Sequence, residues 1–150
     1  GRFAPSHEFV FHFNRESVRP QKTVDCKHAG ETNHGSGLRG KDGEVQGYCH
    51  AGDSVQDKKI ADSVLRIMRH KARGIECEHP AVFPIALPAF AMQSWPGVAY
   101  EPFCGSGSTL IAAEQLNRRC FGMEISPAYC DVIVKRWENL TGKTAVLEAA

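Results

Sequence analysis

Two glycines and one downstream acid are the residues of this sequence whose types and spacing could bind a nucleoside-like ligand. Gly105 and Gly107 directly follow a short apolar segment, 98–100. Glycines at that place let the backbone approach a ligand closely, and free N–H groups at the start of a following helix can hold a polar group. Glu124 lies near the end of the next apolar segment, 119–125. Its carboxylate is therefore expected beside the same crevice, where it would suit the two hydroxyls of an adenosine ribose.

Three ligand classes use a loop of this kind, and the residues after the glycines separate them. A dinucleotide loop carries Gly-x-Gly-x-x-Gly, but position 110 is Leu. A nucleoside triphosphate loop ends in Gly-Lys-Ser/Thr, and no lysine follows Gly107. S-adenosylmethionine has no phosphate and needs only close backbone approach and a ribose acid. The pattern favours S-adenosylmethionine, and the alternative is a tight structural turn with a solvated Glu124.

The segments that must position these residues indicate a parallel α/β unit. We expect strands at 98–100 and 119–125, a helix at 108–116, and a second helix from Pro127 to Gly142. A first-turn proline and a terminal glycine are typical helix boundaries. Strand, loop, helix, strand and helix in this order place both strand ends at one edge of a sheet.

Side-chain patterns refine the helices of this unit. Ser106 or Ser108 is expected to cap the first helix and Ser126 the second. The second helix carries an apolar stripe of Tyr129, Ile133, Trp137 and Leu140. A further short helix is expected at 85–94, because prolines precede it and Pro96-Gly97 ends it.

Upstream of this unit the sequence is less regular. Residues 8–13 alternate apolar and polar side chains, which predicts a strand. Residues 14–57 show no periodicity and hold seven of the 14 glycines, so we expect an irregular insertion that is either a functional loop or locally disordered. Residues 60–68 fit a helix or a short strand.

Several motifs together resemble the amino-type DNA methyltransferases, which methylate adenine N6 or cytosine N4. Residues 101–108, Glu-Pro-Phe-Cys-Gly-Ser-Gly-Ser, resemble that family's Asp-Pro-Phe-x-Gly-Ser-Gly-Thr loop. Residues 79–84 resemble its motif X, which precedes the loop in the β-type motif order. Gly122-Met123-Glu124 and Tyr129 resemble its ribose-binding acid and the helix after it. Residues 62–67 resemble the extended segment before motif X, which favours a strand there.

The resemblance, which covers roughly residues 60–140, implies a Rossmann-like S-adenosylmethionine methyltransferase fold. That fold is an α/β, three-layer structure with a mostly parallel sheet, here incomplete and carrying the Gly-rich irregular insertion. It implies S-adenosylmethionine as the cofactor, bound by His79, Pro80, Phe83, Pro84, Glu101, Pro102, Phe103, Cys104, Gly105, Ser106, Gly107, Ser108 and Glu124.

The sequence departs from the family pattern in two places. Glu101 stands where Asp is usual, and the chain contains no Pro-Pro dipeptide, although the family's catalytic motif is Asp/Asn/Ser-Pro-Pro followed by an aromatic residue. In the β-type order that motif lies before residue 1, and the chain starts with Gly1, so we expect a C-terminal fragment with no catalytic residue of its own. Residues 1–13 would end the catalytic half, 14–57 would contact the DNA target, and 58–150 would bind the cofactor.

The expected function is thus a DNA methyltransferase of restriction-modification type, acting on adenine N6 in preference to cytosine N4 and inactive as this chain alone. The alternatives are a non-catalytic cofactor- or DNA-binding module and one subunit of a split methyltransferase. A dinucleotide oxidoreductase is a more distant alternative.

Charge and cysteine usage bear on partners and location. Residues 1–75 hold 13 Lys and Arg against 9 Asp and Glu, whereas residues 76–150 hold 5 against 8. A basic half fits a nucleic-acid face, so double-stranded DNA is the expected partner, with a second chain carrying the catalytic motif as a further one. The six cysteines form no CxxC pair, which favours reduced thiols, a cytoplasmic location and no metal site. The expected DNA contacts are Arg15, Arg19, Lys22, Lys27, Arg39 and Lys41.

Overall fold

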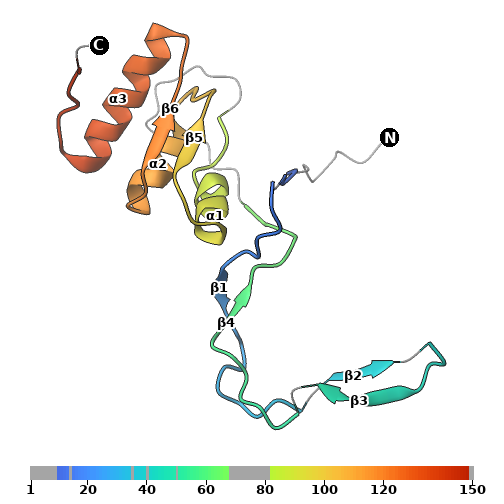
Figure 1. The fold of residues 1–150 in the computed structure, drawn as a ribbon. Helices are drawn as coiled ribbons and strands as arrows, with labels where there is room; N and C mark the ends of the chain where they lie inside the picture. The colour runs from blue at the N-terminus through green and yellow to red at the C-terminus, as the bar shows by residue number, and fades with distance from the viewer. Residues whose placement is uncertain are drawn as a thin grey trace, which may run out of the picture.

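The computed structural model describes residues 10–13, 15–34, 36–39, 41–49, 51–67 and 82–148. Figure 1 shows an α/β unit that contains all three helices and a thin two-stranded arm that extends from it. The elements are, in order, β1 (Lys22–Asp25), β2 (Ser36–Arg39), β3 (Val45–Cys49), β4 (Lys58–Ile60), α1 (Ala86–Ser94), β5 (Ala99–Glu101), α2 (Ser108–Gln115), β6 (Cys120–Gly122) and α3 (Pro127–Thr141).

The α/β unit confirms the predicted order of strand, loop, helix, strand and helix. Strands β5 and β6 pair in parallel, with Ala99 opposite Cys120 and Glu101 opposite Gly122. Parallel neighbours require a crossover connection, and α2 supplies it. Helices α1 and α3 also lie where the sequence predicts helices, and Gly142 ends α3 with a left-handed φ of 69°.

The core of the unit lies between α1, α2 and the two-stranded sheet. Met92, Ala112 and Ala113 are its buried members, and small side chains on α2 let the neighbouring elements approach closely. The opposite face of the sheet stays open to solvent in the described structure, where Tyr100 and Phe121 are exposed. One face of the sheet is therefore packed and the other is not.

Arg118 holds the end of α1 against the turn between α2 and β6. Its guanidinium donates to the carbonyl of Met92 at 2.8 Å, to that of Trp95 at 3.3 Å, and to that of Gly97. The last carbonyls of a helix lack partners within the helix, and a cation beside them is favourable. The preceding Asn117, in a left-handed conformation (φ 51°), turns the chain toward this position.

The described residues between 22 and 60 form an antiparallel arm, which corrects the expectation of an irregular insertion. Strand β1 pairs with β4, and β2 pairs with β3. Between these pairs the ladder continues, because the amide of Cys26 donates to Asp57 at 2.8 Å and that of Gly30 to Val55 at 2.9 Å. Both faces of an isolated two-stranded arm are open to water, so apolar alternation, the usual sign of a strand, is absent from its sequence.

Two other predicted strands, at 8–13 and 62–67, are not found in the described residues. Residues 10–13, the described part of the strand predicted at 8–13, form no strand and their apolar side chains are exposed. The strand expected at 62–67 is absent, since β4 ends at Ile60. An apolar segment becomes a strand only beside a partner edge, and the described residues provide none at either place.

Strand β6 also ends early, and the predicted helix caps differ. It stops at Gly122 rather than continuing to residue 125, so Glu124 lies in the turn before α3. The N-cap of α2 is Gly107, which has no side chain to cap the helix. Ser126 is the N-cap of α3, as predicted, but its side chain makes no capping hydrogen bond. Ser108 does not cap α2 as expected. Its hydroxyl donates instead to the carbonyl of Phe83 at 3.1 Å.

Within the described residues, no helix combines the length and apolar character needed to cross a bilayer.

Candidate functional site

The loop after β5 is fixed at its start by Glu101. One carboxylate oxygen accepts the amide of Phe103 at 3.1 Å, and the other accepts the hydroxyl of Thr109 at 2.9 Å. Glu101 thereby ties the end of β5 to the first turn of α2. A carboxylate at this position shapes the loop, and its two oxygens are engaged in doing so.

Glu124 joins the same loop to the start of α3. One of its carboxylate oxygens accepts the amide of Gly105 at 2.7 Å, and the other accepts the amide of Ser126 at 2.9 Å. Hydrogen bonds to an ionised carboxylate are stronger than those between neutral groups. The acid and the glycine loop therefore meet at the edge where the two parallel strands end, as the sequence predicts.

A cleft of about 660 Å³ opens at this meeting point. Its walls come from the segment before α1, from the loop after β5 and from the turn after β6. The lining residues are Val82, Phe83, Pro102, Phe103, Cys104, Gly105, Ser106, Ser108, Met123, Glu124 and Ile125. Eight of these eleven residues were predicted from the sequence as a single binding site.

Other predicted site residues lie outside this lining. His79 and Pro80 fall outside the described residues. Glu101, Gly107 and Pro84 are described but do not line the cleft. Glu101 instead accepts hydrogen bonds from Phe103 and Thr109, which hold the loop in place. A Cβ added to Gly107 would lie 2.9 Å from Ile133 on α3, so Gly107 faces α3.

Three apolar lining residues, Val82, Met123 and Ile125, were not among the predicted site residues, although Val82 and Met123 lie within the motifs at 79–84 and 122–124. Met123 and Ile125 flank Glu124 in the sequence. The side chains of two lining residues are largely exposed, Ile125 at 97% and Phe103 at 84%. Apolar residues on both sides of an acid at a strand end could have indicated them. Grouped exposed apolar side chains often mark a binding surface, and here they surround one carboxylate.

Among the described residues that line the cleft, Cys104 carries a thiol, and this thiol is poorly suited to act as a nucleophile. Cys104 is buried, and burial raises the pKa of its thiol, as does the negative charge of Glu101. A raised pKa keeps the thiol protonated near neutral pH, whereas the thiolate is the reactive form.

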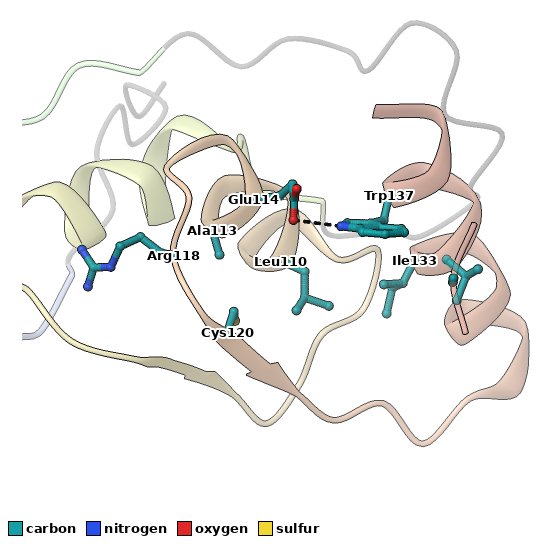
Figure 2. A pocket seen from close by; sticks show the side chains of 9 residues that line it. Leu110, Ala113, Glu114, Arg118, Cys120, Ile133 and Trp137 are labelled. Carbon is teal, nitrogen blue, oxygen red and sulfur yellow. Dashed lines mark hydrogen bonds between the residues drawn. The ribbon is translucent and has the colours of Figure 1, made fainter. Parts of the chain in front are cut away.

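A second, smaller hollow of about 240 Å³ lies between α2 and α3 (Figure 2). Leu110, Cys120 and Ile133 are among its lining residues. Its polar groups are already engaged: the indole of Trp137 donates to Glu114 at 3.0 Å, as Figure 2 shows, and the Arg118 guanidinium binds carbonyls of the α1 end. The hollow is therefore a packing gap between two helices and contains none of the predicted site residues.

The expected DNA contacts are distributed along and before the arm. Lys22 lies in β1, Arg39 ends β2, and Lys41 lies in the turn that follows. Residues 14–57 carry six Lys and Arg against seven Asp and Glu, so this region has no excess of positive charge. The net charge of residues 14–57 does not attract DNA phosphates. Attraction would therefore depend on where the individual Lys and Arg side chains lie along the arm.

Comparisons with known proteins find similarity to one protein family and to several individual proteins. The profile of a protein family described as DNA methylase matches residues 1–135. The orphan methyltransferase M.BamHII of Bacillus amyloliquefaciens is 40% identical over 68 residues, which are 43% of this chain and 26% of that protein. The type II methyltransferase M.SmaI of Serratia marcescens is 32% identical over 89 residues, which are 57% of this chain and 30% of that protein.

A solved structure shows a similarity of the same limited extent. The crystal structure of the M1.HpyAVI–SAM complex aligns with 41% of this chain and 32% of that chain, at 28% identity and a TM-score of 0.38. The chain spans between about a fifth and a third of the length of the curated relatives that it matches.

Proposed function

Because the chain belongs to the amino-type DNA methylase family, we propose that it forms the S-adenosylmethionine-binding part of a DNA methyltransferase. One observation carries the proposal: the Gly105 amide and the Glu124 carboxylate meet on the wall of an otherwise largely apolar cleft. A few polar groups in an apolar cleft are typical of small-molecule sites.

The lining residues divide between the parts of such a ligand. Each Glu124 oxygen already accepts one backbone amide, and a carboxylate oxygen can accept more than one hydrogen bond, so the ribose hydroxyls can be held as well. The apolar surfaces of Phe103, Met123 and Ile125 suit the faces of an adenine ring. The rest of the loop from Pro102 to Ser108 is left for the methionine end. When bound, the cofactor supplies an electrophilic methyl group on its sulfonium.

The substrate in this proposal is a base amino group of double-stranded DNA. That amino group is inaccessible within the base stack, so the complete enzyme would extrude the base into its active site. We propose adenine N6 as the target in preference to cytosine N4. A duplex methylated by the chain together with a polypeptide that carries the Pro-Pro-aromatic motif can be digested to nucleosides. Mass spectrometry then distinguishes N6-methyladenine from N4-methylcytosine, and finding only the latter would contradict the choice.

Calorimetric titration of the chain with S-adenosylhomocysteine tests the cofactor assignment. Saturable binding is expected, whereas NAD should give no heat of binding, because Leu110 stands where a dinucleotide loop has its third glycine. S-adenosylhomocysteine is preferred to the methyl donor because it is chemically stable. Binding of NAD in place of S-adenosylhomocysteine would contradict the proposal.

We further propose that the arm and the segment before it contact DNA through Arg15, Arg19, Lys22, Lys27, Arg39 and Lys41. Because phosphate contacts release counterions, the affinity for a DNA duplex should fall as salt concentration rises. Replacing Lys27 and Lys41 together by Gln should reduce the slope of log affinity against log salt by about 2, since each phosphate contact contributes about 1.

Fluorescence anisotropy over a series of salt concentrations measures that slope. Replacement of Lys135 and Lys143 by Gln, two lysines on and after α3, is the matched control and should leave it unchanged. DNA binding that does not respond to salt, or equal slopes for both double variants, would contradict a role for the arm.

A further inference from the structure

Helix α3 contacts the glycine loop through two residues on one face, and neither of them lines the cleft. The guanidinium of Arg136 donates to the carbonyl of Ser106. Ile133 lies three positions earlier, and a Cβ on Gly107 would come within 2.9 Å of it. Residues three apart share a helix face, so both contacts come from the same side of α3.

The Ser106 carbonyl needs that donor. Ser106 is only 5% exposed, and a buried carbonyl that loses its partner is costly. The peptide that contains this carbonyl leads into Gly107, whose φ of 80° lies in the left-handed region that glycine enters freely. A peptide beside such a glycine can rotate at little steric cost, so local backbone preference alone does not fix where this carbonyl points.

The orientation of that peptide bears directly on the cleft. The amide of Gly107 donates to the carbonyl of Cys104 at 2.7 Å and closes a turn around Gly105. The amide of Gly105, inside that turn, is the group that reaches Glu124 at 2.7 Å. Rotation of the Ser106–Gly107 peptide would move the Gly107 amide, open the turn and displace the Gly105 amide from Glu124.

We propose that Arg136 is a positioning residue for the cofactor cleft: by holding the Ser106 carbonyl toward α3, it keeps the loop in its ligand-binding conformation. The inference rests on the proposed cofactor site and adds a residue that lines no part of it. Arginine suits the role because its charge is permanent and its planar fork can hold more than one acceptor.

Arg136→Met tests the proposal, and Arg118→Met is its matched control. Both substitutions remove a guanidinium that binds backbone carbonyls, but the Arg118 partners lie at the end of α1 and outside the cleft. Arg136→Met should weaken S-adenosylhomocysteine binding by about tenfold, which corresponds to about 1.4 kcal/mol. Arg118→Met should lower the melting temperature at least as much while changing the dissociation constant by less than about twofold. Arg136→Lys, which restores one charged donor, should recover most of the lost affinity.

The outcomes separate this inference from the proposed function. If the unaltered chain does not bind S-adenosylhomocysteine, the proposed cofactor site is wrong. If the unaltered chain binds and Arg136→Met binds equally well, only the role of Arg136 is wrong. That role is also wrong if Arg118→Met loses as much affinity as Arg136→Met, because the effect then reflects general stability. Should Arg136→Met fail to fold, Arg136→Gln replaces it under the same criteria.

Discussion

Incubated with labelled S-adenosylmethionine and mixed-sequence duplex DNA, the chain by itself should incorporate no label above background. None of its 150 residues provides the Pro-Pro-aromatic motif with which the family grips a base amino group, and the described cleft supplies groups suited to binding. Holding two reactants in near-attack geometry contributes as much as about 7–11 kcal/mol to a reaction of this type. A chain that holds one reactant alone should therefore be slower by many orders of magnitude.

The decisive comparison adds a second polypeptide that carries the Pro-Pro-aromatic motif. Label incorporation in the mixture, and in neither component alone, supports a methyltransferase whose cofactor half is this chain. Cofactor binding without incorporation in either case supports the alternative of a non-catalytic module. Robust incorporation by the chain alone would overturn the assignment, because no described residue could then be credited with gripping the base.

Glu124→Ala should weaken S-adenosylhomocysteine binding by more than tenfold. The substitution removes the acceptor for the ribose hydroxyls and also the charged partner of the Gly105 and Ser126 amides. A hydrogen bond to a charged group contributes about 1.5–3 kcal/mol before any discount for exposure, and Glu124 is half-buried. Even about 2 kcal/mol in total corresponds to more than a tenfold change in the dissociation constant, which calorimetric titration measures.

Glu114→Ala is the matched control for this change. Glu114 is a half-buried glutamate of the same unit, but its carboxylate accepts the Trp137 indole in the gap between α2 and α3 (Figure 2). Its loss should reduce the free energy of unfolding and leave the affinity near that of the unaltered chain. Unchanged affinity in Glu124→Ala, or equal losses in both variants, would remove Glu124 from the ligand site.

The α/β unit could be predicted because its boundaries are marked by residues with strong local preferences. Gly105, Gly107, Pro127 and Gly142 fix a turn, a helix start and a helix end largely through their own backbone chemistry. Once two parallel strands are recognised, their ends must meet at one edge. The meeting of the loop with Glu124 follows from the sequence for that reason.

The remaining features depend on partners that are remote in sequence and leave no local pattern. The arm is held by main-chain hydrogen bonds between segments such as Cys26 and Asp57, and a ladder without a buried face imposes no apolar alternation. Arg118 and Arg136 bind carbonyls 21 to 30 residues away. Backbone carbonyls are present at every residue, so nothing in the sequence indicates which of them an arginine will find.

The base of the arm lies beside the end of α1, since Lys22 lies opposite Ile60 and the Gln21 amide donates to the carbonyl of Ser94 at 2.7 Å. Residues inserted in equal numbers into both of its strands would lengthen it without shifting the register at its base. Such changes would leave the spacing between Gly105 and Glu124 unaltered, because none of the arm residues that the structure describes lines the cleft. In evolutionary terms, the arm can vary in length and sequence, or be exchanged between relatives, while selection on the residues that line the cleft continues undisturbed.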